Sequence, residues 1–159
     1  MKARTSFALF AAFLCLLPLS SLCPAADADG PGSVDEAWMK AMKANDLDAI
    51  VACYAKDAIA WLPNEAQAKG TDAIRATYKG LLDTYTVSDV KNADTAYQTF
   101  GDRAVAWGTF TLVLTPKNGG AAMTMTGRYT EFLEKRDGRW VYVVDHASAD
   151  PAPAKPMEK

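Results

Sequence analysis

The chain has 159 residues, with 17 lysine and arginine residues against 19 aspartate and glutamate residues, and a formal net charge of -2 at pH 7. This balance provides no basic surface for nucleic acid or anionic lipid, so we expect no nucleic-acid partner and no membrane partner for the mature protein. The length suits one domain built around one hydrophobic core.

The first residues have the pattern of a secretory signal peptide. Lys2 and Arg4 precede an apolar run over residues 7–19, which is too short to span a bilayer. Small residues follow, and the best cleavage site is Ala26-Asp27-Ala28. We therefore predict that residues 1–28 are removed and that the protein is periplasmic or secreted.

A lipoprotein carrying its lipid on Cys23 is a less favoured alternative, because Leu22 is bulky where lipoprotein processing requires a small residue. Signal removal would leave 15 basic residues against 18 acidic residues. It would also leave Cys53 as the one cysteine, so the mature chain cannot form an intramolecular disulfide.

Composition divides the mature chain into three parts. Residues 29–33 contain proline and glycine without apolar periodicity and predict a flexible leader. Residues 34–148 predict the folded domain. Residues 149–159 are rich in proline and charge and predict a disordered tail.

Helical patterns come first along the domain. Ser33 and Glu36 have the spacing of a capping box before apolar residues at helical intervals. Asp46 is placed to cap a second helix, and Thr71 a third. Between the second and third helices, residues 58–62 predict a short strand.

Alternating strand patterns follow the helices. Turn-forming residues separate predicted strands at 85–99, 103–115, 123–135 and 140–148. Long hairpins after three helices indicate an α+β fold, in which a curved antiparallel sheet wraps around the helices as a cone. A curved sheet of this kind encloses a pocket.

Several motifs together resemble the SnoaL-like and ketosteroid isomerase-like branch, which includes domains of unknown function, of the nuclear-transport-factor-2-like superfamily. The motifs are residues 45–48, 57–58, 70–75 with Tyr78, 127–129, 136–140 and 145–148. The resemblance covers residues 34–148 and implies the cone fold. It also implies a homodimer as relatives often form, and a choice among isomerase, cyclase, dehydratase, hydrolase and non-catalytic assembly domain.

The resemblance to ketosteroid isomerases also implies where their catalytic residues would fall. The general base would stand at Leu62, the oxyanion-donating tyrosine at Trp38, and the acidic donor near Thr130. Leucine takes no proton, and indole is a far less acidic donor than a phenol. Steroid isomerisation is therefore not the expected activity.

His146 is the first catalytic candidate, since it is the single histidine and titrates near neutral pH. Strict strand alternation would put it on one face with Tyr142, and Asp145 on the other face. A direct pair between His146 and Asp145 is then disfavoured. The alternative is a structural histidine at a strand end.

Arg128 and Glu131 are the other catalytic candidates, and alternation places them on opposite faces of one strand. Arg128 could hold a carboxylate or enolate oxygen, and a desolvated Glu131 could act as a base. Either could instead be a charge on the sheet surface, and the sequence leaves open which face is interior.

Large aromatic residues are numerous enough to line a pocket for a planar or apolar ligand. The ligand-binding candidates are Trp38, Tyr54, Trp61, Tyr78, Trp107 and Tyr129, with Asn64 at the rim. Ordinary core packing is the alternative for most of them. One histidine and one cysteine do not make a metal-ligand set, so we expect no metal and no tightly bound cofactor.

Three functions remain open. The leading hypothesis is a secreted domain that binds a small, apolar or planar molecule, with weak acid–base chemistry at His146. The second is a cofactor-independent isomerase, cyclase or dehydratase. The third is a non-catalytic dimeric assembly domain.

Overall fold

The computed structural model describes residues 30–151. The predicted signal peptide, the alternative lipid site at Cys23 and tail residues 152–159 lie outside the described range. Within that range, no helix combines the length and apolar character needed to cross a bilayer.

Three helices, α1 (Gly32–Ala44), α2 (Leu47–Ala52) and α3 (Thr71–Thr84), form the predicted helical layer. Asp46 caps α2 as predicted, because its side chain accepts a hydrogen bond from the Ala49 amide at 3.0 Å. The other two predicted caps are wrong. The Ser33 hydroxyl instead bonds the Gly30 carbonyl, and α3 starts after Gly70 without a side-chain cap.

One six-stranded sheet faces the helices, in the order β2-β1-β6-β5-β4-β3. Its strands are β1 (Tyr54–Trp61), β2 (Ala68–Lys69), β3 (Tyr85–Phe100), β4 (Arg103–Pro116), β5 (Met123–Arg136) and β6 (Arg139–Ala149). The four long predicted strands are confirmed to within one residue at each end. The sheet is antiparallel except between β1 and β6, which pair in parallel.

The end of β6 extends the folded part beyond the predicted boundary. Ala149 belongs to the strand, and the Asp150 amide donates to the Thr126 carbonyl at 2.8 Å. The Arg128 guanidinium also pairs with the Asp150 carboxylate at 2.7 Å. Ala149 and Asp150 are therefore part of the domain.

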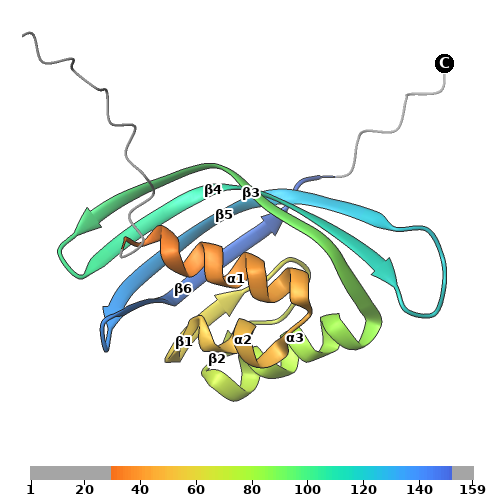
Figure 1. The fold of residues 1–159 in the computed structure, drawn as a ribbon, viewed down its shortest axis with the longest axis horizontal. Helices are drawn as coiled ribbons and strands as arrows, with labels where there is room; N and C mark the ends of the chain where they lie inside the picture. Colours follow the sequence, from red (N-terminus) through yellow and green to blue (C-terminus); the bar gives the residue numbers. More distant parts are fainter. Residues whose placement is uncertain (1–29, 152–159) are drawn as a thin grey trace, which may run out of the picture.

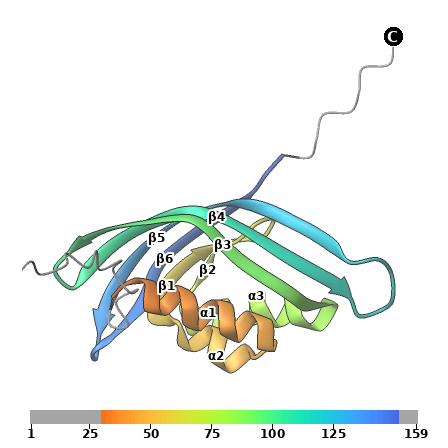
Figure 2. The same ribbon diagram turned by 45° about the horizontal axis from the view of Figure 1, so that its top comes forward.

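The sheet is curved, and all three helices lie against its concave side (Figures 1 and 2). α1 packs on β3 and β6, while α3 packs on β1 and β3. The space between the two layers holds the core, which includes Ile50, Ile74, Tyr78, Val87, Val90, Leu114 and Leu133. The predicted α+β cone is confirmed.

An irregularity in β6 decides which side chains face the helices. Phe132 pairs with Val144 and the next residue of β5, Leu133, pairs with Tyr142, so Val143 is an extra residue in β6. Such a bulge interrupts strand alternation. Tyr142 and Asp145 are therefore both buried on the concave side, and the predicted placement of His146 on the face of Tyr142 is wrong.

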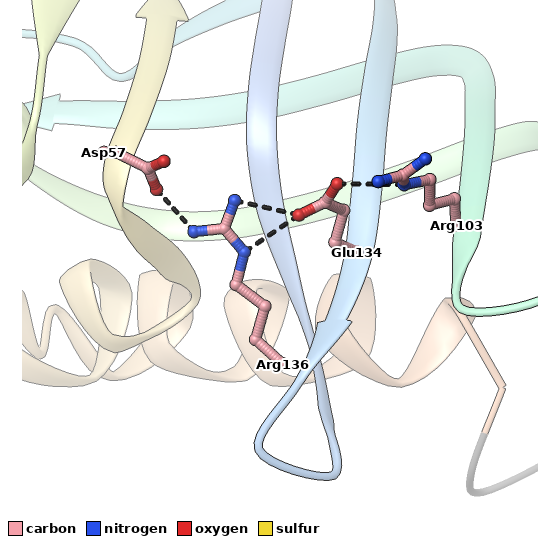
Figure 3. Close-up of polar contacts among 4 residues, drawn as sticks. All are labelled: Asp57, Arg103, Glu134 and Arg136. Carbon is pink, nitrogen blue, oxygen red and sulfur yellow. Dashed lines mark hydrogen bonds and ion pairs between the residues drawn. The ribbon is translucent and has the colours of Figure 1, made fainter.

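The outer face of the sheet carries a chain of ion pairs (Figure 3). The Arg136 guanidinium contacts the Asp57 carboxylate at 2.5 Å and the Glu134 carboxylate at 2.8 Å. Arg103 contacts the other oxygen of Glu134 at 3.1 Å. This chain crosses from β1 to β4, and because it is open to water we expect it to contribute little to stability.

Candidate functional site

A cavity of about 110 Å³ lies between the helices and the concave face of the sheet. Its walls are largely apolar and include Met42, Leu62, Leu81, Phe110, Leu112, Leu114 and Met125. Apolar cavities of about 150 Å³ admit benzene. The present cavity is smaller than that, so it suits a ligand body of one ring at most.

Polar side chains also border the cavity. They are Trp38, Glu65, Thr77, Tyr78, Asn92, Tyr129, Glu131, Tyr142 and Asp145. Pockets that combine apolar walls with a few converging polar groups are typical binding or active sites.

A directed chain of hydrogen bonds ends on Asp145. The Tyr54 hydroxyl donates to the Asp145 carboxylate at 2.7 Å, so the Tyr78 hydroxyl must donate to Tyr54, at 2.6 Å. The Trp38 indole then donates to Tyr78 at 3.1 Å. Residues from α1, β1, α3 and β6 are thus joined in one network.

Asp145 is only 6% exposed. Burial raises the pKa of its carboxyl to about 6, although the hydrogen bond from Tyr54 lowers it. Nearby negative charge on Asp35 raises it further. At neutral pH the group is therefore mainly ionised but close to its titration point, which suits a general base.

Asp35 forms a second polar cluster with residues of β3 and β6. Its two carboxylate oxygens accept the hydroxyls of Tyr142, at 2.7 Å, and of Tyr97. Burial raises the pKa of Asp35, and these two hydrogen bonds counteract part of that effect. α1 thus contributes a buried acid that the helical pattern did not reveal.

Glu131 lies between these clusters, directly across the strand pair from Asp145. Burial raises the pKa of Glu131 to about 11, and the charges of Asp35 and Asp145 add to the rise. Its Oε2 atom has no hydrogen-bond partner among the described residues. Glu131 is consequently protonated at neutral pH beside a carboxylate.

The structure brings together four of the predicted site residues at the cavity surface: Trp38, Tyr78, Tyr129 and Glu131. Tyr54 lies next to this set and contacts it through its hydroxyl. Both Leu62, at the position of the isomerase base, and Trp38, at that of the oxyanion donor, also border the cavity.

The remaining predicted site residues lie elsewhere. His146 and Trp61 lie on the outer face of the sheet, with ring centres 6.3 Å apart. Trp107 is 43% exposed, and Arg128 is paired with Asp150 at the surface. Asn64 is exposed in the loop after β1.

Sequence reasoning missed Asn92, Tyr142 and Asp145 as cavity groups, and Asp35 as the buried acid next to them. One signal was available for Asp35, which lies three residues before Trp38 and seven before Met42 on the apolar stripe of α1. The inward position of Asp145 depends on the bulge at Val143, for which the sequence gives no sign.

The acids around the cavity do not form a metal-binding set. Among residues 30–151, no three histidine, cysteine, aspartate or glutamate side chains are grouped in a way that could hold a metal ion. The arrangement can instead accept hydrogen bonds and exchange protons at Asp145 and Glu131.

The fold and site define an α+β cone with an acid-containing cavity. The model of the SnoaL-like domain family matches residues 36–143, so the chain belongs to this family. The family lies within the nuclear-transport-factor-2-like superfamily, as the sequence motifs predicted. No curated protein matches the chain in sequence.

Solved structures share the fold. A ketosteroid isomerase-like protein from Erwinia carotovora atroseptica is 20% identical, with a TM-score of 0.66 over 76% of this chain and 93% of that one. A protein from Xanthomonas campestris, provisionally named a calcium/calmodulin dependent protein kinase II association domain, is 25% identical, with a TM-score of 0.69 over 80% and 93%. A Streptomyces avermitilis protein, provisionally named a dehydratase from the NTF2-like family, is 15% identical, with a TM-score of 0.66 over 76% and 94%.

Proposed function

We propose that this protein binds a small, largely apolar molecule in the cavity between the helices and the sheet. The observation that supports the proposal is a ring-sized apolar space with Asp145 and Glu131 buried at its surface. Buried carboxyl groups without cationic partners are costly to a fold, so a ligand-binding role gives a reason for them.

A cavity-filling substitution tests the proposal. Ala147 borders the cavity, while Ala149 is exposed at the end of the same strand. We expect Ala147→Leu to weaken the binding of fluorobenzene at least fivefold in ¹⁹F NMR titrations, and Ala149→Leu to leave it unchanged. Equal binding by both variants would contradict the cavity as the site.

A second candidate function is cofactor-independent acid–base catalysis, such as isomerisation, cyclisation or dehydration. It is favoured by the pKa of Asp145, near 6, beside a protonated Glu131 in an apolar space. Asp145 would take a proton from a substrate carbon, and Glu131 would donate one.

Deuterium exchange separates catalysis from binding alone. If Asp145 is a base, the protein should accelerate exchange of the acidic C–H groups of phenylacetone in D₂O, as followed by ¹H NMR. Asp145→Asn should abolish the acceleration, while His146→Ala, on the outer face, should retain it. Exchange that depends on His146 would return the catalytic role to that residue.

We also propose that the protein is exported and forms a homodimer. Export rests on the signal-peptide pattern, and N-terminal sequencing of the processed protein should begin at Asp29. The dimer is supported by two rows across the outer face. One row is apolar, with Val105, Phe132, Val144 and Ile59, and the other carries Trp107 and Trp61 at its ends with Thr130 and His146 between them.

A further inference from the structure

The hydrogen-bond donors around the cavity are already engaged. The Trp38 indole donates to Tyr78, Tyr78 donates to Tyr54, and the Thr77 hydroxyl donates to the Ala73 carbonyl. In a separate pair, the Tyr142 hydroxyl donates to Asp35.

Tyr129 and Asn92 complete this set of donors. The Tyr129 hydroxyl is paired with the Thr95 hydroxyl at 2.6 Å. Asn92 makes a side-chain hydrogen bond that lowers the pKa of Tyr129, against the larger rise that burial causes. Because Asn92 Oδ1 has no partner, the amide nitrogen is the Asn92 atom that makes this bond, as a donor.

Acceptor atoms, in contrast, remain without partners. Among the described residues, the buried side-chain oxygens that lack a hydrogen bond are Asn92 Oδ1 and Glu131 Oε2, and both residues border the cavity. Only 7% of the surface of Glu131 is exposed, so the residue is more than nine-tenths buried. An unmet acceptor of this kind costs about 1–3 kcal/mol, which a donor on a ligand would recover.

Apart from the tyrosines, the side chains around the cavity that can ionise are all carboxylic acids. Asp145 and Glu131 border it, Asp35 lies behind Glu131, and Glu65 lies in the loop after β1. No lysine or arginine is among the lining residues, and the buried charged side chains of residues 30–151 are all acidic. The carboxylate of Asp145 thus receives a hydrogen bond from Tyr54, and the positive charge of His146 on the outer face lowers its pKa, but it makes no direct ion pair within the described chain.

We propose that the ligand has an apolar, ring-sized body and a hydrogen-bond-donating head, and that a protonated amine is the head group the cavity prefers. An alcohol would satisfy the unmet acceptors, whereas an ammonium would also neutralise the carboxylate, through shorter and stronger hydrogen bonds. A ketone would have to compete with Asp35 for the proton of Glu131, and an anion would be repelled by the carboxylate of Asp145. The inference rests on the proposed function, because it takes the cavity as the binding site.

Three molecules with the same carbon skeleton test the inference. We expect 1-phenylethylamine to bind the purified protein at least tenfold more tightly than acetophenone in isothermal titration at pH 7.5, with 1-phenylethanol between them. A smaller preference, or tighter binding of acetophenone, overturns the inference while leaving the binding function intact. Absence of binding by all three contradicts the proposed function and the inference together.

Matched variants connect the preference to its cause. Asp145→Asn removes the charge but keeps the shape, and should reduce the amine-over-ketone preference to threefold or less. Asp150→Asn makes the same change at the exposed partner of Arg128 and should retain the wild-type preference. If Asp145→Asn does not fold, Glu131→Gln serves as the second variant. The wild-type affinities also decide by themselves, because equal affinities for the amine and the ketone overturn the inference. An unchanged preference in a folded Asp145→Asn variant would also overturn it.

Discussion

At the scale of single residues, the pKa of Asp145 makes stability depend on pH. Its pKa is about 6 in the folded protein, against about 3.9 in an unfolded chain. Between these values the native state binds more protons, so the free energy of unfolding falls as the pH rises. Glu131 acts in the same direction, because its pKa is also raised.

We therefore expect the free energy of unfolding to fall by about 2–3 kcal/mol between pH 4 and pH 6.5 through Asp145 alone. Urea denaturation at several pH values measures this change. Asp145→Asn should reduce the slope, whereas Asp150→Asn, at the surface, should not. A stability that rises across this window would contradict the assignment.

Tyr54 supplies the hydrogen bond that keeps Asp145 ionised. Tyr54→Phe removes the donor, so the pKa of Asp145 should rise above about 6, as measured by carboxyl ¹³C NMR. The free energy of unfolding at pH 7.5 should fall by about 1.5–3 kcal/mol, the range for hydrogen bonds to charged groups.

Tyr85→Phe is the matched control, since no hydrogen bond of the Tyr85 hydroxyl is present in the described structure. It should change neither quantity. A Tyr54→Phe protein with an unaltered Asp145 pKa would show that burial alone sets the titration.

Residue types predicted part of the site. Aromatic residues at core spacing predicted Trp38, Tyr78 and Tyr129, which do border the cavity. His146 was selected because histidine is the residue type associated with proton transfer near neutral pH, but burial raises the pKa of the Asp145 carboxyl to about 6. Burial is a property of the folded chain, so composition could not reveal it.

At the scale of elements, β5 requires a glycine at position 127, where it lies between β4 and β6 in the sheet. A Cβ atom at Gly127 would lie 2.1 Å from the Ser148 carbonyl and 2.6 Å from the Phe110 ring. Because the carbonyl belongs to the backbone of the neighbouring strand, it cannot move away without breaking the ladder.

Gly127→Ala should therefore lower the free energy of unfolding by about 3 kcal/mol or more, as measured by urea denaturation. Gly80→Ala provides the opposite control, since Gly80 lies within α3 and a Cβ there meets no atom within 4 Å. It should stabilise the protein by about 0.5–1 kcal/mol. Equal effects would refute the close approach at Gly127.

Element types and ends were readable because hydrophobic period and turn residues are local signals. The parallel partner of β1 and the short strand β2 were not, since pairing depends on distant residues. The bulge at Val143 had the largest effect on the site. One extra residue reversed the facing of Asp145 and His146, although the boundaries of the four long strands were right to within one residue. The strand predicted at 58–62 begins four residues earlier, at Tyr54.

At the scale of the whole molecule, the proposed homodimer predicts a charge-sensitive outer face. Trp107 lies at the end of the row that also contains Thr130, while Phe100, which is 58% exposed, lies at the end of β3. Trp107→Lys should convert a dimer into a monomer in sedimentation equilibrium, because an ammonium group would be buried at the interface. Phe100→Lys should remain dimeric. A wild-type monomer would exclude this interface.

The pairing of β1 with β6 has a consequence for the order of folding. Their paired residues are separated by about 85 positions along the chain, and such distant contacts form slowly. During synthesis, β1 can pair with β6 only after β6 has been translated, and Asp145 is part of β6. A nascent chain that ends before β6 would hold Tyr54 and Tyr78 but not their carboxylate acceptor, so the polar network is completed only at the end of translation.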